Sequence, residues 1–281
     1  MAGAAALRVR TVYLGTSDFA AAVLRRLHDS PHRPVLVITR PDSPQGRGRK
    51  LTPSPMAIVA GELGVDVYQP ESVNSEEALA HIAEAAPDAL CVCAFGALIK
   101  EPLLSRHPIL NVHPSLLPRW RGAAPIERAI LAGDRETGVS IIRLTAGLDS
   151  GPICLQEPVP IEPEDDYGAL AARLQALGGE LLVRALDEQP DCAEQDEVGV
   201  TYAEKLTAED RRLDPSQSPA EQVRRVRALS PHIGAYLEQP DGSRLGVWEA
   251  RDLGGRLDLI RVQPPGKRPM AYADYERGHP R

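Results

Sequence analysis

The stretch Ala-Leu-Cys-Val-Cys-Ala at residues 89–94 is apolar at every position. A strand that helices cover on both faces has this continuous apolar character, whereas a strand with one face in water alternates apolar and polar residues. Strands covered on both faces are typical of parallel sheets. The stretch therefore predicts a central strand of an open α/β sheet over residues 89–95.

Strand-like and helix-like segments alternate on either side of this stretch. Residues 9–15 (VRTVYLG) predict a strand, and the apolar residues of 18–27 recur at the spacing of a helix. Further strands are predicted at 35–39, 66–68, 109–113, 138–144 and 153–161, and further helices at 54–63, 74–85 and 165–186. This alternation predicts a Rossmann-like α/β fold whose open sheet is rich in parallel pairs.

The last part of the chain has a different pattern. A helix is predicted at 218–229, then a hairpin over 234–250 with Asp241-Gly242 at its turn, and one more strand at 257–263. These segments predict a small all-β domain that is OB-like. The acidic stretch 187–199 offers few apolar side chains for burial, so we expect a linker there and predict two domains, 1–204 and 205–281.

Length and composition narrow the class of protein. Of the 281 residues, 43% are hydrophobic and 25% charged, which excludes a disordered or fibrous protein. No apolar run reaches the roughly 18 residues of a membrane span, and the N-terminus lacks a secretory signal pattern. The four cysteines are too few and too scattered for a disulfide framework, and Cys91-x-Cys93 has no His nearby to complete a metal site. We therefore expect a cytoplasmic enzyme in a reducing compartment.

Charge is distributed unevenly along the chain. Residues 1–204 hold 18 basic and 28 acidic side chains, and residues 205–281 hold 14 basic and 11 acidic ones. An acidic protein can still bind nucleic acid when its basic residues gather where the phosphates pass. Arg47, Arg49 and Lys50 lie together in the long loop predicted over 40–50. They are predicted to neutralise phosphates, and a solvated loop without a partner is the alternative.

Two polar side chains leave the same face at the end of the predicted strand 109–113. Asn111 and His113 are two residues apart, and Pro114 ends the strand. Ligands of open α/β sheets bind outside the carboxyl ends of the strands. Asp149 is the only charged residue of the Gly-rich loop 145–152, which lies between two later strands. An amide, an imidazole and a carboxylate on neighbouring strand ends predict a catalytic site, although each alone could be structural.

These three groups suit the transfer of an acyl group to an amine. When an amine attacks a carbonyl carbon, the oxygen becomes an oxyanion, which the amide of Asn111 and the protonated ring of His113 can stabilise as hydrogen-bond donors. Asp149 would tune His113 through its negative charge and help to move the proton that the amine loses. The sequence has no G-x-S-x-G elbow, so we expect direct attack by the amine, without a covalent intermediate or a metal.

Several segments resemble the formyltetrahydrofolate-dependent formyltransferase family, over residues 9 to 270. HPSLLPRWRG (113–122) and LDSGPI (148–153) are similar to motifs of the whole family. RPDSPQGRGRKLTPSP (40–55) and TYAEKL (201–206) resemble its methionyl-tRNA formyltransferase branch. The resemblance implies transfer of the formyl group of 10-formyltetrahydrofolate to the α-amino group of methionyl initiator tRNA, a step of translation initiation.

The resemblance also implies roles for individual residues. It implies that Asn111, His113 and Asp149 are catalytic. It implies that folate is contacted from two loops, by Ser115, Leu116, Leu117 and Pro118, and by Phe95, Gly96 and Leu98. For the loop with Arg47, Arg49 and Lys50 it implies contact with the tRNA acceptor end, and for residues 205–281 an OB-like, tRNA-binding domain. It implies a monomer that binds folate and tRNA and neither a metal nor a membrane.

Two features depart from the family pattern. RDLGGR (251–256) replaces a longer segment between two strands, which predicts a shortened C-terminal domain that lacks about two strands. His232 follows Ser230-Pro231, where the family has an aromatic residue.

Two alternative functions stay open from the sequence. A relative that formylates the amine of a nucleotide sugar would keep the three catalytic groups and have no use for the basic loop. A non-catalytic RNA-binding protein would not need all three of the polar groups of Asn111, His113 and Asp149.

Overall fold

The structure, a computed structural model, describes residues 8–45 and 50–278. The chain divides into two compact units. Unit 1 contains Met1–Arg121, Gly138–Pro158 and Ala172–Val200, and unit 2 contains Gly122–Thr137, Val159–Ala171 and Thr201–Arg281. Each unit therefore consists of more than one segment of the chain. The domain boundary between residues 204 and 205 stays a prediction.

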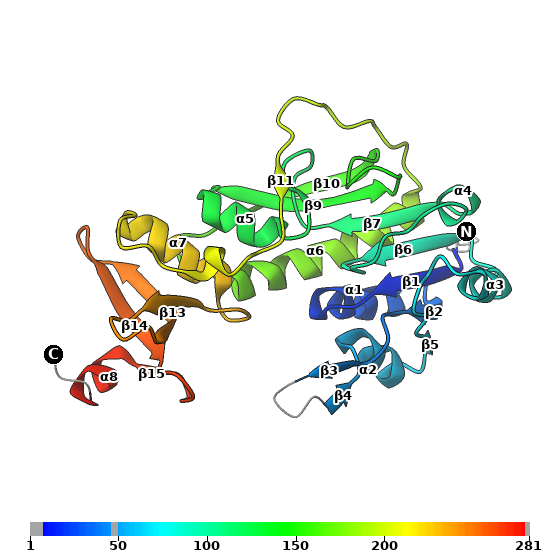
Figure 1. The fold of residues 1–281 in the computed structure, drawn as a ribbon. Helices are drawn as coiled ribbons and strands as arrows, with labels where there is room; N and C mark the ends of the chain where they lie inside the picture. Colours follow the sequence, from blue (N-terminus) through cyan, green and yellow to red (C-terminus); the bar gives the residue numbers. More distant parts are fainter. Residues whose placement is uncertain (1–7, 46–49, 279–281) are drawn as a thin grey trace, which may run out of the picture. The chain divides into compact units, whose positions relative to one another are not determined.

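A seven-stranded sheet forms the centre of unit 1 (Figure 1). Its strands are β1 (Thr11–Gly15), β2 (Pro34–Ile38), β5 (Asp66–Tyr68), β6 (Ala89–Cys93), β7 (Ile109–His113), β9 (Glu136–Arg143) and β10 (Ile153–Pro160), in the order β10-β9-β7-β6-β1-β2-β5. The strands from β7 to β5 pair in parallel, and β9 pairs antiparallel with β7. The predicted Rossmann-like, parallel-rich α/β sheet is confirmed.

The described part of unit 1 contains five helices, three of which begin at capping serines. They are α1 (Asp18–His28), α2 (Pro55–Glu62), α3 (Glu76–Glu84) and α4 (Leu103–Arg106), and α6 (Tyr167–Glu188) enters the unit with most of its length. Ser17, Ser54 and Ser75 precede the first three, and each serine side chain accepts a hydrogen bond from a backbone N–H of the first turn. None of the helices that the structure describes is long and apolar enough to cross a lipid bilayer.

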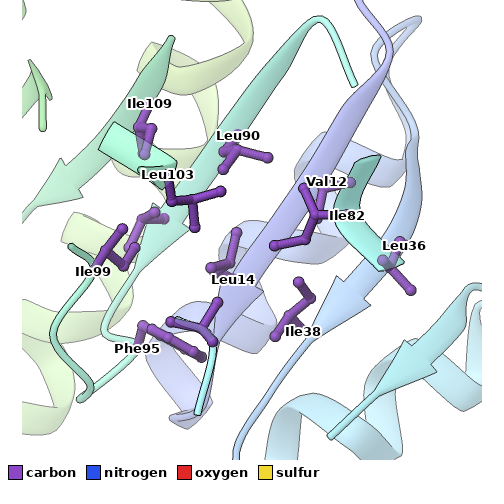
Figure 2. Packing of buried hydrophobic residues seen from close by; sticks show 12 residues of the cluster. Val12, Leu14, Leu36, Ile38, Ile82, Leu90, Phe95, Ile99, Leu103 and Ile109 are labelled. Atoms are coloured by element: carbon purple, nitrogen blue, oxygen red, sulfur yellow. The ribbon is translucent and has the colours of Figure 1, made fainter. Parts of the chain in front are cut away.

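Helices cover both faces of the sheet around β6, which explains why all five residues of β6 are buried. On one face, Val12, Leu14, Leu90 and Ile109 pack in one cluster with Ile82 of α3 and Leu103 of α4 (Figure 2). On the other face, α6 approaches β7 so closely that a Cβ at Gly178 would lie 2.9 Å from Val112. Alternate residues of β7 therefore face opposite helix layers.

The basic segment after β2 is partly a hairpin rather than a simple loop. β3 (Ser43–Gln45) and β4 (Lys50–Thr52) pair antiparallel. Strands of three residues are too short to show an alternating pattern in the sequence, so the loop predicted over 40–50 was wrong at residues 43–45 and at Lys50. Arg47 and Arg49 lie outside the described residues, and Lys50 is exposed on β4.

Unit 2 contains a small antiparallel sheet, as predicted. Its strands are β12 (Ala235–Glu238), β13 (Arg244–Asp252), β14 (Leu257–Gln263) and β15 (Met270–Ala271), in that order. The unit also contains α5 (Pro125–Ala132), β11 (Tyr202–Ala203), a 3-10 turn (Glu209–Arg211), α7 (Pro219–Leu229) and α8 (Tyr272–Gly278). The first residue of β8 (Arg121–Gly122) belongs to unit 1 and the second to unit 2. Val226 and Leu229 of α7 pack with Leu245, Val247 and Val262 of the sheet. The described part of this sheet has four strands, fewer than the five of an OB fold.

Two of the four cysteines form a disulfide that the sequence did not lead us to expect. Cys154 of β10 is bonded to Cys192, which stands in the acidic stretch predicted to be a linker. The two residues meet because Ile153 and Ala193 form an antiparallel β-bridge. Part of the acidic stretch is therefore attached to unit 1, through pairing that neither its composition nor the spacing of 38 residues reveals.

The two remaining cysteines, Cys91 and Cys93, are free and buried in β6. Burial raises the pKa of each thiol to about 12. The thiolate is the reactive form, so neither side chain is expected to react while the protein is folded.

Thiol counting tests this assignment. With a chromogenic thiol reagent at pH 8, the native protein is expected to show no fast-reacting thiol, and the denatured protein two, from Cys91 and Cys93. Protein that is reduced and then denatured should show four reactive thiols, one from each cysteine. Four thiols in the unreduced denatured protein would contradict the Cys154–Cys192 disulfide.

Candidate active site

Strand β7 presents Asn111 and His113 on one face. Both side chains are largely buried, with 8% and 4% of their residue surfaces exposed. Val112, between them, faces α6 on the other side of the sheet. The two polar groups therefore lie on the same side of the strand because they are two residues apart.

The ring of His113 is held between two hydrogen-bond acceptors. Its Nε2 lies 2.9 Å from the carbonyl oxygen of Trp120, which can only accept, so Nε2 carries a proton. Its Nδ1 lies 3.6 Å from Oδ2 of Asp149. The orientation of the ring is therefore set by the Trp120 carbonyl, and Nδ1 faces the carboxylate of Asp149.

Asp149 completes the group, although it does not arrive from the strand end that we expected. The last residue of β9, Arg143, pairs with Leu110 near the start of β7, because β9 is antiparallel. The following loop therefore folds back along β7 to bring Asp149 Oδ1 within 3.5 Å of Asn111 Nδ2. Asp149 itself has a left-handed backbone, with a φ of 44°.

The loop closes tightly at its far end. The backbone N–H of Arg143 donates to the carbonyl of Pro152 at 2.9 Å. A Cβ at Gly151 would lie 1.8 Å from the carbonyl oxygen of Arg143, so no other residue fits there without a shift of the backbone. The glycine-rich composition of this loop thus follows from its geometry.

The structure brings Asn111, His113 and Asp149 together, as predicted, and their roles stay predictions. The carboxylate is 3.5 Å from the amide and 3.6 Å from the imidazole. Charge-assisted hydrogen bonds are shorter, about 2.7–2.9 Å. A polar substrate atom that binds among the three groups would therefore replace weak contacts rather than strong ones.

The predicted folate residues after β7 are held rigidly by the protein itself. Ser115 and Leu117 are buried, whereas Leu116 and Pro118 are partly exposed. The hydroxyl of Ser140 donates to the carbonyl of Ser115 at 2.7 Å and accepts from the backbone N–H of Leu117 at 3.2 Å. This bonding fixes the backbone of the segment immediately after His113.

The predicted folate residues after β6 differ in exposure. Phe95 is buried in the core cluster (Figure 2), and Thr16 donates to its carbonyl at 2.9 Å. Gly96 has a φ of 72° and is exposed. Leu98 is 65% exposed, so it is the member of this group with a large apolar side chain at the surface. β6 and β7 are neighbours, so both loops leave adjacent strand ends.

Sequence reasoning missed two further groups beside the site. The carbonyl of Trp120 orients His113, and the side chain of Gln195 donates to the carbonyls of Asp149 and Gly151. A backbone group leaves no signal in a residue pattern. Gln195 stands 46 residues from Asp149, in the stretch that was predicted to be a linker, so no spacing marks it.

Over residues 8–45 and 50–278, no cluster of three or more His, Cys, Asp or Glu side chains is arranged to hold a metal ion.

The family described as formyl transferase matches residues 8–186 of this α/β chain, so the chain is a formyltransferase. Methionyl-tRNA formyltransferase from Halorhodospira halophila is 42% identical over 305 aligned residues, which cover 97% of this chain and 97% of that protein. The chain belongs to the methionyl-tRNA formyltransferase family. The alignment is longer than the 281 residues of this chain, so the chain lacks segments that this relative has.

Solved structures share the fold. Methionyl-tRNA formyltransferase from Clostridium thermocellum superposes with a TM-score of 0.66 at 13% identity, covering 91% of this chain and 98% of that one. HypX from Aquifex aeolicus, in complex with tetrahydrofolic acid, superposes with a TM-score of 0.66 at 15% identity, covering 95% of this chain and 47% of the HypX chain. At these identities the likeness shows the fold alone.

Proposed function

We propose that this enzyme transfers the formyl group of 10-formyltetrahydrofolate to the α-amino group of methionyl initiator tRNA by direct attack of the amine. The observation that carries the mechanism is the convergence of Asn111 and His113 on the carboxylate of Asp149, at 3.5 and 3.6 Å. Family membership supports the choice of substrates, because the relative that covers nearly the whole chain is a methionyl-tRNA formyltransferase.

The amine nitrogen attacks the formyl carbon in the first step. A carbon–nitrogen bond forms, and the electron pair of the carbonyl moves to its oxygen. The N–H of Asn111 and the Nδ1–H of the protonated His113 ring donate to this oxyanion. One such donor is typically worth about 2.7–4 kcal/mol of the barrier.

Proton transfer accompanies the second step. The attacking nitrogen becomes cationic and gives a proton to Asp149, which lies beside both donors. The oxyanion then collapses to a carbonyl, which breaks the bond from the formyl carbon to the folate nitrogen. That nitrogen takes the proton from Asp149 as tetrahydrofolate leaves, so Asp149 is again a carboxylate. The products are formyl-methionyl-tRNA and tetrahydrofolate, so atoms and charge balance without a further reactant.

Folate is assigned to the loops that follow β6 and β7. Their residues leave adjacent strand ends next to His113, and Leu98 presents an exposed apolar side chain there. HypX, of which 47% superposes on this chain, is solved in complex with tetrahydrofolic acid, which supports a folate ligand. We take the enzyme to act in the cytoplasm, as a monomer.

Product formation tests the proposal. Purified protein is incubated with 10-formyltetrahydrofolate and methionyl initiator tRNA, and formyl-methionine is measured after hydrolysis of the product. Parallel reactions offer an amino sugar nucleotide and uncharged tRNA instead. Formyl-methionyl-tRNA is the expected product, and no product at high enzyme concentration would refute the proposal.

The alternative functions are not favoured. A sugar formyltransferase would use the same three groups, but the relative similar over 97% of the chain carries the methionyl-tRNA name. A non-catalytic RNA-binding protein is not favoured either, because Asn111, His113 and Asp149 are all present and close together.

Phosphate contact by the basic hairpin is testable through Lys50. Lys50→Ala is expected to raise KM for the tRNA and to make the slope of log affinity against log salt shallower by about 0.7–0.9, because one phosphate contact is lost. Filter binding of the tRNA at a series of salt concentrations measures the affinities from which the slope is obtained. An unchanged slope would contradict a contact by Lys50, which is exposed on β4.

A further inference from the structure

We propose that Gln195 is a positioning residue that holds the loop of Asp149 folded back along β7. The proposal deepens the proposed function and rests on it, because it takes Asp149 as the carboxylate of the reaction. Gln195 is not in the motifs that predicted the site.

The side chain of Gln195 bonds to both sides of Ser150. Its Nε2 donates to the carbonyl oxygen of Asp149 at 2.7 Å and to that of Gly151 at 2.8 Å. Its Oε1 accepts from Nε of Arg121 at 3.0 Å. Carbonyls only accept and a guanidinium only donates, so these partners fix the orientation of the amide. They use both of its N–H donors and one of its two acceptor lone pairs.

Arg121 connects the same amide to the other side of the site. It is 4% exposed and follows Trp120, whose carbonyl orients the ring of His113. Gln195 therefore links the loop that carries Asp149 to the segment that orients His113. The distance between the side chains of His113 and Asp149 depends on the positions of this loop and this segment.

The loop needs such a support for two reasons. It folds back along β7 instead of continuing β9, and Asp149 has a φ of 44°, a left-handed conformation that residues other than glycine adopt uncommonly. Strained residues at functional sites persist when the surrounding structure over-determines them. Two hydrogen bonds from Gln195 to the carbonyls on either side of Ser150 hold the backbone of Asp149 in this conformation.

Gln195 is itself placed by a well-anchored segment. Ala193 exchanges two backbone hydrogen bonds with Ile153, at 2.7 and 2.9 Å, and Cys192 is bonded to Cys154. The side chain of Gln195 thus reaches the loop from a fixed backbone. Losing its amide should shift Asp149 without releasing the segment.

Kinetics distinguish positioning from simple structural support. A misplacement of about 1 Å can cost about 10²-fold in rate. Gln195→Met keeps the length of the side chain and loses all three hydrogen bonds. Gln195→Glu keeps an acceptor for Arg121 and loses the donor to the loop. Both are expected to lower kcat about 10–100-fold while KM for 10-formyltetrahydrofolate and for the tRNA stays within about twofold.

A matched control stands next to Gln195 in the same segment. The side chain of Glu194 is exposed, and Glu194→Gln should keep wild-type kcat. Hydrogen exchange provides a readout that does not need activity: the peptide over residues 145–152 should exchange faster in Gln195→Met and Gln195→Glu than in the wild type and in Glu194→Gln.

The outcomes separate the two proposals. Wild-type kcat in Gln195→Glu, or unchanged exchange of residues 145–152 in both Gln195 variants, would overturn the positioning role. A wild-type protein without formyl transfer would overturn the proposed function, and the exchange of the loop would still decide the role of Gln195.

Discussion

Replacing Asp149 by Asn is expected to lower kcat for formyl transfer by about 10²–10⁴-fold. The amide cannot take up the proton that the attacking amine loses, and it removes the negative charge 3.6 Å from Nδ1 of His113. Asn tolerates the left-handed backbone of Asp149, so this variant keeps the loop conformation. Single-turnover formyl transfer at saturating substrates measures the change.

Asp187 offers a matched control for this substitution. Its carboxylate lies 2.9 Å from Nε2 of the buried His32, in a pair outside the proposed active site. Asp187→Asn makes the same chemical change and should leave kcat within about twofold of the wild type. An Asp149→Asn enzyme with kcat near that of Asp187→Asn would contradict the proton-transfer role of Asp149.

Replacing His113 by Ala is expected to lower kcat by at least about 10³-fold. The variant loses a donor to the oxyanion and the partner of Asp149 in one change. Binding of the folate should be largely retained, because the predicted folate residues are separate side chains on the loops after β6 and β7. Calorimetric titration with a non-reactive folate and a single-turnover assay measure the two quantities.

Folding of the His113→Ala protein is checked separately, since the hydrogen bond to the carbonyl of Trp120 is lost as well. His113→Asn serves as a second variant, because its amide can still donate a hydrogen bond in this region. Activity of both variants within tenfold of the wild type, with unchanged unfolding temperature, would show that His113 is not part of the reaction.

Much of the fold could be predicted because it depends on local residue patterns. The continuous apolar run of β6 indicated a strand covered on both faces, and Ile109 and Val112 of β7 do face different helix layers. The helices α1, α2 and α3 begin close to the predicted positions because capping serines and apolar spacing lie within one helical turn.

Other features could not be predicted because they depend on pairing between distant segments. The hairpin of β3 and β4 has strands too short for a period to show. The disulfide between Cys154 and Cys192 depends on the β-bridge between Ile153 and Ala193, which no composition of an acidic stretch reveals.

The order of residues specifies which groups are available for the chemistry. The spacing of Asn111 and His113 places an amide and an imidazole on one face of a strand, because side chains alternate with a period of two. The way in which Asp149 reaches them depends on how the sheet is assembled. The direction of β9 sets where the following loop begins, and strand direction is a property of pairing between chain segments, so the folded-back loop and its contact with Gln195 appear only when the sheet has formed.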